Sequence, residues 1–505
     1  MKRLLVVCAL MVLGGICLGK DIIISSESCE YRDVSCDMFN YENWYKDEVS
    51  YKYALEDLDM LVYLVKTAYS GYEDAVKRGL KIDEIADAFK KEYGENDIIK
   101  VSELSKFIGD YLSPYIQDCH FCIESRDFRK NLVTLYRVLY SDVYVKKVND
   151  GFVVEKSDNK DIQTGDIVEV ETGNLFLYPS EGDGIYRLGA YATMEENKKE
   201  ISVNSLDEKK YIICSKENEY FWSEDITKYK EIATKDSLYI YISLFMDLME
   251  IDNRKLKVDE NFARLKTVSE RYPEKKNIIL DLRTNGGGNA LNPYKFLANL
   301  YFCEKNCSEK KSIKNCCKVQ KKVNGLKEKI EIISPPVQQA ENWLVENVFC
   351  DEKIFSKQVN KRKKILKKRD LKITYTAKRN KKEKSGIPVF KGKLIILSGK
   401  NSCSASEDTI CMAKDIFSKT NQFYQIGENS AGCYEFGNVW CYQLINSGIA
   451  LHLSEFKNTF TEKCPEGWGV APDYWATNDD LVKAIVNVTG DQELSEKLKD
   501  INKDL

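Results

Sequence analysis

Two short apolar runs, each leading directly into a turn of small residues, constrain the fold of this chain more than any other feature. Ile278–Leu280 runs into the glycine-rich turn Asp281–Gly288, and Leu394–Leu397 runs into the serine-rich turn Ser402–Glu407. Short continuous apolar runs bounded by turn residues are typical of buried strands. The sequence therefore places a glycine-rich backbone turn and a candidate nucleophile, Ser404, at the ends of two strands.

The two turns together fit acyl-transfer chemistry. A serine hydroxyl must attack a carbonyl carbon, and backbone N–H groups must hold the oxyanion that forms. The glycine turn is followed by Asn289–Leu291 and so lacks the lysine of a phosphate-binding loop, and its glycines lack the spacing of a dinucleotide-binding loop. The serine turn retains a simpler interpretation, in which Ser404 or Ser406 is the N-cap of a helix over Glu407–Phe417.

Composition and charge narrow the class of protein. A chain of 505 residues, 43% hydrophobic and 31% charged, is long enough for about two to four globular domains. The formal net charge of −3 gives no reason to expect nucleic acid or an anionic membrane as a partner.

The N-terminus has the pattern of a secretory signal over residues 1–19. The charged pair Lys2–Arg3 precedes the apolar run Leu4–Cys17, and Gly19 is a small residue suited to cleavage. We therefore expect a secreted or periplasmic protein with no integral membrane segment once the signal is removed. Lipid anchoring at Cys17 is disfavoured, because Ile16 stands where a small residue is expected.

The cysteines predict disulfide bonds in an exported protein. The chain has 17 cysteines, and loss of Cys8 and Cys17 with the signal leaves 15. An odd number requires at least one free or intermolecular thiol. The candidates for pairing are Cys29 with Cys36 and the cluster Cys303, Cys307, Cys316 and Cys317.

The patterns along the chain predict an α/β (α+β multidomain) fold. Helical periodicity indicates an N-terminal helical domain over 20–131, which carries His120, and short strand-like segments indicate a β-rich module over 132–235. Strands alternating with helices indicate an α/β catalytic core over 236–302 and 388–505. A basic, cysteine-containing insertion over 303–387 separates its two parts, either as a docking surface for acidic partners or as a solvated surface segment.

A serine nucleophile needs a base, and the chain contains only two histidines. His452 lies in an alternating strand pattern typical of a structural residue, whereas His120 lies where the helical domain meets the β-rich module. The flanking Cys119 and Cys122 leave a zinc site open as an alternative, although adjacent Cys119 and His120 rarely bind one ion together.

The runs Asp281–Gly288 and Ser404–Glu407 resemble the signature of the tail-specific, or C-terminal-processing, serine peptidases (family S41). This resemblance implies a ClpP/crotonase-like core. One branch of that family uses a lysine soon after the serine, but no lysine lies between Lys419 and Lys457 here. The chain therefore resembles the His-dependent branch, which includes the tricorn core protease and the chlamydial protease-like activity factor. That branch is matched by Asp118–His120, Gly427–Gly432 and Glu466–Pro472.

The resemblance implies a role for each matching residue. Ser404 would be the nucleophile, His120 the general base and then acid, and Glu466 the group that orients the histidine. The oxyanion hole would be formed by backbone N–H groups of Gly287 or Gly288 and of Ala405. No metal or cofactor is implied. Asp118, Glu407 and Glu428 compete with Glu466 for the carboxylate role, and Asp281 with Arg283 is expected to form a structural pair.

The family also often carries a PDZ module before the core. Gly165–Val170 resembles the Gly-Asp-hydrophobic strand of such a module, so the β-rich region is open to interpretation as a diverged PDZ-like domain that binds carboxyl termini.

We therefore expect a secreted serine endopeptidase that hydrolyses peptide or protein substrates through an acyl-enzyme on Ser404. The alternative is a catalytically inactive protein of the same fold that binds apolar ligands or protein partners. The sequence does not indicate the oligomeric state.

Overall fold

A computed structural model describes most of the chain after its N-terminal region. The described residues are 45–148, 151–170, 175–177, 184–205, 208–218, 225, 227–245, 254–302, 329–333, 372–376, 390–417, 422–458 and 464–502. The predicted signal and the predicted disulfide candidates Cys29, Cys36, Cys303, Cys307, Cys316 and Cys317 lie outside them. No described helix is both long enough and apolar enough to cross a membrane.

The chain forms two compact units, each assembled from three stretches of sequence. The first unit contains Met1–Val133, Gln320–Glu383 and Cys433–Gly467, and the second contains Thr134–Val319, Lys384–Gly432 and Trp468–Leu505.

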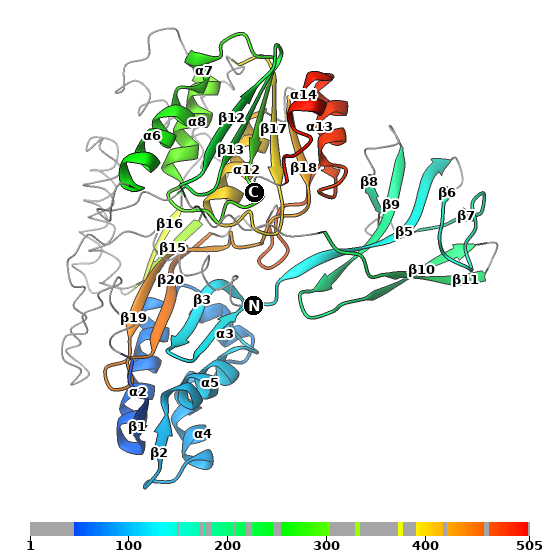
Figure 1. The fold of residues 1–505 in the computed structure, drawn as a ribbon. Coiled ribbons are helices and arrows are strands. Elements are labelled where there is room, and N and C mark those ends of the chain that lie inside the picture. The colour runs from blue at the N-terminus through cyan, green and yellow to red at the C-terminus, as the bar shows by residue number, and fades with distance from the viewer. Residues whose placement is uncertain are drawn as a thin grey trace. The chain divides into compact units, whose positions relative to one another are not determined.

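The first unit packs helices against antiparallel strands (Figure 1). Its helices are α2 (Tyr51–Ala68), α3 (Tyr72–Lys77), α4 (Ile85–Glu92) and α5 (Val101–Leu112), and a short ribbon pairs β1 (Glu48–Ser50) with β2 (Ile98–Lys100). In α2, Leu58, Leu61 and Val65 recur at helical spacing and are fully buried. The helical periodicity that the sequence shows is therefore the apolar face that packs into the core of this unit.

The sheet of the first unit joins strands that are far apart in sequence. Its order is β16-β15-β20-β3-β4, and β19 also pairs with β20. The strands are β3 (Asp118–Ser125), β4 (Phe128–Leu132), β15 (Lys329–Ile333), β16 (Lys372–Thr376), β19 (Phe436–Gln443) and β20 (Ala450–Asn458). The sequence interpretation differs here, because it assigned all of 388–505 to the α/β core, whereas β19 and β20 belong to this sheet. It also treated 20–131 as helical, although the strands β3 and β4 lie at its end.

The second unit contains a six-stranded sheet with order β12-β13-β14-β17-β18-β21, in which β12 alone is antiparallel. The strands are β12 (Tyr229–Ala233), β13 (Ser237–Ile242), β14 (Asn277–Asp281), β17 (Lys393–Ser398), β18 (Phe423–Gly427) and β21 (Tyr474–Trp475). The two apolar runs of the sequence are β14 and β17, which are neighbours and parallel. Their carboxyl ends, and hence the two turns, therefore lie at the same edge.

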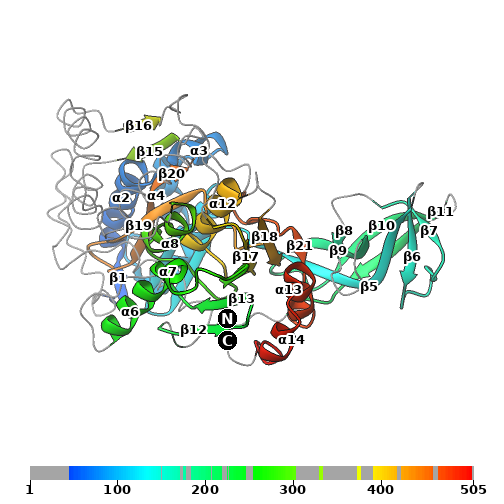
Figure 2. The same cartoon turned by 90° about the horizontal axis from the view of Figure 1, so that it is seen from above.

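Helices cover both faces of this sheet, as expected for buried parallel strands. Alternate side chains of the strands, such as Ile279 and Ile395, pack against α13 (Leu481–Thr489) and α14 (Glu493–Lys497). Figures 1 and 2 show the other helices on the opposite face. They are α6 (Arg254–Lys266), α7 (Val268–Arg271), α8 (Leu291–Phe302) and α12 (Ala405–Phe417).

The remaining strands of the second unit lie within 132–235, the region expected to be a β-rich module, although β12 of the same region belongs to the six-stranded sheet. They form a five-stranded antiparallel sheet and a two-stranded one. The strands are β5 (Tyr136–Val148), β6 (Gly151–Lys156), β7 (Ile167–Val168), β8 (Leu175–Leu177), β9 (Ile185–Thr193), β10 (Lys199–Ser205) and β11 (Glu208–Cys214). The predicted α/β (α+β multidomain) fold is thus confirmed, while the PDZ interpretation of this module stays a prediction.

Candidate active site

Ser404 occupies a strained turn between strand β17 and helix α12. Its φ angle is +53°, and it is the one non-glycine residue with positive φ among the residues that the structure describes. A side chain disfavours this region of backbone conformation, which occurs with enrichment at functional sites. A sharp strand-to-helix turn of this kind also presents the serine hydroxyl of hydrolases to their substrates. Ser404 itself is half-buried.

The glycine turn packs directly against the serine turn. A Cβ atom built on Gly287 would lie 2.7 Å from the carbonyl oxygen of Cys403 and 2.9 Å from the Cβ of Ser404. Asn285 joins the two turns, because its carbonyl accepts the N–H of Cys403 at 3.1 Å and the hydroxyl of Ser406 at 2.8 Å. The pairing of turns that the sequence suggested is therefore present in the second unit.

The backbone N–H groups beside Ser404 differ in whether they already have an acceptor. The N–H of Gly287 is already donated to Oδ1 of Asn285 at 2.9 Å. Within the described residues, the N–H groups of Gly288 and Ala405 have no acceptor. Of the two glycines that the sequence offered, Gly288 is therefore the one whose N–H is not engaged by a described residue.

In the part of the chain that the structure describes, neither Ser404 nor Ser406 makes the hydrogen bond of an N-cap, in which the side-chain oxygen accepts a backbone N–H of the first helical turn. The hydroxyl of Ser406 is donated to Asn285, and no described residue hydrogen-bonds the hydroxyl of Ser404. The Glu407 carboxylate instead accepts the N–H of Ser404 at 3.0 Å, which is one half of a capping box. The Ser404 hydroxyl is thereby left free of a capping role.

Glu407 also fixes the motif Gly427–Gly432. Its other oxygen accepts the hydroxyl of Ser430 and the N–H of Gly432, both at 2.6 Å. Glu407 is fully buried, and these donors satisfy its carboxyl oxygens. Glu407 is thus a structural carboxylate of the nucleophile turn, and Glu428, which accepts the hydroxyl of Tyr140 at 2.5 Å, is likewise engaged elsewhere.

His120 lies in the first unit, in an irregular part of strand β3. The register with β4 pairs Asp118 with Leu132 and Cys122 with Asn131, so the three residues between them have no regular partners. Such bulges aim side chains at the borders of sheets and are common beside active sites.

Two carboxylates surround the His120 imidazole. Oδ1 of Asp118 accepts the backbone N–H of His120 at 2.8 Å and lies 3.7 Å from its Nδ1. The side-chain ligand atoms of Asp118, His120 and Glu466 all lie within 4.8 Å of one another. His120 and Asp118 are buried, and burial lowers the pKa of His120 to about 4 and raises that of Asp118. The imidazole is therefore neutral at physiological pH, as a general base must be.

Glu466 binds backbone groups on both sides of the histidine bulge. Its Oε1 accepts the N–H of Cys119 at 2.7 Å, and its Oε2 accepts the N–H of Glu435 at 3.0 Å. The first unit thus brings together His120 and the predicted Glu466. Asp118, the alternative to Glu466 in the sequence interpretation, lies in the same cluster, since the side-chain ligand atoms of all three residues are within 4.8 Å of one another.

Cys119 and Cys433 lie at disulfide distance within the first unit. Their sulfur atoms are 2.08 Å apart and their Cα atoms 5.2 Å apart, although the two residues are separated by 314 positions in sequence. The sequence interpretation missed this pair. A signal was present, since Cys433 directly follows the motif Gly427–Gly432 in a chain with many cysteines. Cys122, the other member of the Cys-x-x-Cys motif, is a buried thiol.

The second histidine belongs to a different polar cluster of the first unit. His452 is fully buried on β20, and its Nε2 lies 3.3 Å from Oε2 of Glu124. Cys122, Glu124 and His452 converge closely enough to bind a metal ion. However, Arg129 donates to the same Glu124 oxygen at 2.8 Å and already neutralises it, which disfavours a further cation there.

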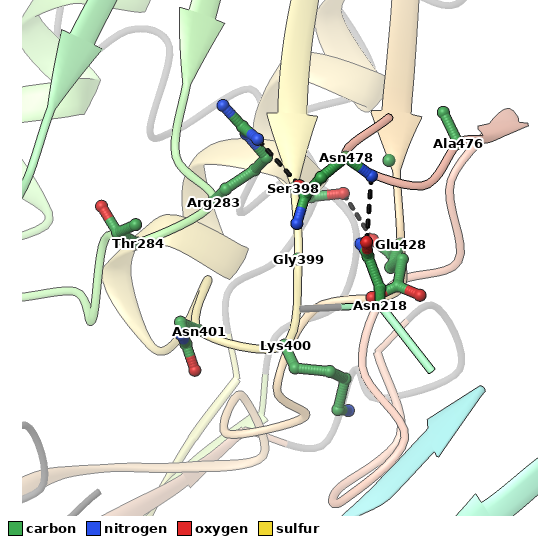
Figure 3. A pocket seen from close by; sticks show the side chains of 11 residues that line it. Asn218, Arg283, Thr284, Ser398, Gly399, Lys400, Asn401, Glu428, Ala476 and Asn478 are labelled. Carbon is green, nitrogen blue, oxygen red and sulfur yellow. Dashed lines mark hydrogen bonds between the residues drawn. The ribbon is translucent and has the colours of Figure 1, made fainter. Parts of the chain in front are cut away.

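A polar pocket of the second unit lies at the carboxyl ends of β14, β17 and β18 (Figure 3). Its charged groups are already engaged: Arg283 forms the expected pair with Asp281 and also donates to Asn478, and Lys400 donates to the carbonyl of Ser430 at 2.8 Å. The pocket contains none of the predicted catalytic residues.

The structure resembles several solved proteases at low sequence identity. It matches mature CPAF complexed with lactacystin over 90% of this chain and 98% of that chain, at 15% identity and a TM-score of 0.45. The photosystem II D1 C-terminal processing protease matches over 88% and 99%, at 11% identity and a TM-score of 0.36. Tricorn protease matches over 89% of this chain and 37% of that chain, at 14% identity and a TM-score of 0.35. No protein-family model and no curated protein matches the sequence.

Proposed function

We propose that this chain is a serine endopeptidase with Ser404 as nucleophile and His120 as general base. One observation carries the proposal: the strained Ser404 turn is packed against a glycine turn, and the Gly288 and Ala405 N–H groups beside it are without acceptors among the described residues. A serine that only capped a helix would need neither the strain nor the glycines. The neutral, buried imidazole of His120 beside two carboxylates supports the second role.

The proposed reaction proceeds through an acyl-enzyme. His120 takes the proton from the Ser404 hydroxyl while Oγ attacks the carbonyl carbon of the scissile bond. The N–H groups of Gly288 and Ala405 hold the oxyanion of the tetrahedral intermediate. His120 then gives its proton to the leaving amine, and water hydrolyses the ester by the same steps. Glu466 and Asp118 stabilise the imidazolium that forms.

We further propose that the substrate is a peptide or an unfolded protein segment, and that the chain is exported. The predicted signal over 1–19 and the Cys119–Cys433 pair at disulfide distance support export. N-terminal sequencing of the protein recovered from the source cells tests this proposal, and a mature N-terminus that retains residues 1–19 would contradict it.

The catalytic proposal is tested with fluorescent casein as substrate and a serine-directed phosphonate as label. Ser404→Ala and His120→Ala should each abolish cleavage, with losses on the order of 10^4-fold or more, and Ser404→Ala should also abolish labelling. His452→Gln is the matched control for the histidine, since it changes the chain's other histidine, and it should retain cleavage. Unchanged turnover by either catalytic variant would remove the assignment. Folded protein without labelling or cleavage would favour a binding protein of the same fold.

A further inference from the structure

The segment that carries His120 is not held by its sheet. Residues between Asp118 and Cys122 lie in the bulge of β3 and lack regular pairing with β4. A base must keep its ring in a fixed position, because a displacement of about 1 Å can lower a rate by about 100-fold. Other contacts must therefore hold this segment.

Cys119, the residue before His120, is held at three of its atoms. Its N–H is donated to Glu466 at 2.7 Å, and its carbonyl accepts the side-chain amide of Asn131 at 3.1 Å. Its sulfur lies at disulfide distance from Cys433. Glu466 also accepts the N–H of Glu435, so the carboxylate and the sulfur bridge connect the same two segments of the first unit.

Cys433 is joined by one peptide bond to Gly432, which is anchored in the second unit. There the Gly432 N–H is donated to Glu407, and the same carboxylate accepts the N–H of Ser404. The Glu407 carboxylate thus connects the backbone of Ser404 with that of Gly432, the residue that is covalently bonded to Cys433.

We propose that Cys119 and Cys433 are positioning residues whose disulfide sets the activity of the enzyme according to its redox surroundings. The inference rests on the proposed peptidase function. A dithiol reductant would transfer two electrons and two protons to the bridge, leaving two thiols and itself becoming a cyclic disulfide. The reduced protein keeps the hydrogen bonds of Glu466 and Asn131 and therefore keeps its fold, but the histidine segment loses its covalent anchor.

The first test is chemical. The purified protein is unfolded in denaturant, alkylated without reduction, digested and analysed by mass spectrometry. We expect a peptide in which Cys119 is linked to Cys433, together with alkylated Cys122. Alkylation of both Cys119 and Cys433 in the unreduced protein would overturn the proposal.

The second test measures casein cleavage by oxidised, reduced and reoxidised wild-type protein and by the double variant Cys119→Ala/Cys433→Ala. We expect kcat to fall at least tenfold on reduction and in the variant, to recover on reoxidation, and to change more than KM. The acid limb of the pH profile should move towards the usual range of histidine, because a released imidazole is better hydrated. Cys122→Ala, from the same strand and equally buried, is the control and should keep both its activity and its response to reductant.

The outcomes separate this inference from the function on which it rests. If oxidised and reduced protein cleave casein equally, the positioning role of Cys119 and Cys433 is wrong and the peptidase proposal still stands. If oxidised wild-type protein neither cleaves casein nor reacts with the phosphonate, the peptidase proposal falls first. Should the double variant not fold, the reversible loss of kcat in wild-type protein remains the deciding measurement.

Discussion

At the scale of single residues, Ser404 and Gly287 depend on each other. Ser404 adopts φ +53°, and Gly287, at φ +102°, leaves room for it by having no side chain. Glycine is the residue that tolerates both the conformation and the close approach. The glycine at position 287 is therefore required by the contact between the two turns, and not by its own turn alone.

We predict that Gly287→Ala inactivates the enzyme by displacing the serine turn. The added methyl group would meet the Cys403 carbonyl at 2.7 Å and the strained φ would cost about 1–3 kcal/mol, so kcat should fall by about 100-fold or more. Gly490→Ala is the control, because that glycine has φ +73° but open space around its Cβ position. Urea unfolding and casein cleavage should show both variants less stable and only Gly287→Ala inactive. Full activity of Gly287→Ala would show that the turn tolerates displacement.

His120 is predicted to remain a base at unusually low pH. Burial lowers the pKa of its imidazole to about 4, so the fall in kcat/KM that follows protonation of His120 should be centred near pH 4. The unfolded chain binds this proton at about pH 6.5, so the stability linked to His120 is complete above that pH and is lost as the pH falls towards about 4. Circular dichroism at each pH separates unfolding from protonation. An acid limb centred near pH 6.5 would contradict the prediction.

Asp118 and Glu466 can be separated by isosteric amides. Asp118→Asn keeps an oxygen that accepts the His120 N–H but removes a buried charge, and burial raises the pKa of this carboxyl. We expect Asp118→Asn to retain or gain stability, whereas Glu466→Gln should lose about 1–3 kcal/mol, since an amide nitrogen cannot accept the Cys119 or Glu435 N–H. The variant with the larger fall in kcat identifies the carboxylate that supports the imidazolium. Equal falls would assign that role to both.

At the scale of secondary-structure elements, the sequence predicted the two buried strands and the helix after Ser404. Strands β14 and β17 contain the two apolar runs, and α12 begins at Ala405 rather than at Glu407. The difference arises because Glu407 acts as the N3 residue of the cap rather than as the first residue of the helix. Nothing in the sequence indicated the bulge in β3, because a bulge is defined by how β3 pairs with β4 and not by the residues of β3 alone.

The start of α12 is predicted to depend on Glu407. Glu407→Ala leaves the N–H groups of Ser404 and Gly432 and the hydroxyl of Ser430 without their acceptor, so the free energy of unfolding should fall by about 2–5 kcal/mol. Glu496→Ala, on the exposed surface of α14, is the control and should be nearly neutral. Urea titration measures both. A Glu407→Ala protein as stable as wild type would mean that water replaces the carboxylate.

At the scale of the whole molecule, each unit is assembled from separate stretches of chain. The core of the first unit includes six buried side chains from β19, β20 and their connection: Val439, Tyr442, Leu444, Ile449, Leu451 and Leu453. At about 1.5–3 kcal/mol for each buried side chain, their contribution is on the order of 10 kcal/mol, comparable to the stability of an entire domain.

We therefore predict that residues 45–133 do not fold alone. A fragment of these residues should show no cooperative urea transition by circular dichroism, whereas the same fragment joined by a Gly/Ser linker to residues 433–467 should show one. Cooperative unfolding of 45–133 by itself would mean that the helices suffice and that the domain boundary expected from the sequence describes an independent domain.

The sequence by itself determined which residues have the chemistry for acyl transfer and which local structures carry them. Apolar runs, glycine turns and helical periodicity depend on neighbours within a few residues, so they can be recognised in the chain. Only the tertiary structure decided that β20 pairs with β3, that Cys119 lies against Cys433, and that the Gly287 N–H is engaged while that of Gly288 is not. These features join residues separated by up to 330 positions, as in the pairing of His452 with Cys122. Because the entropy of closing a loop rises only slowly with its length, sequence distance gives little indication of which distant partner is chosen.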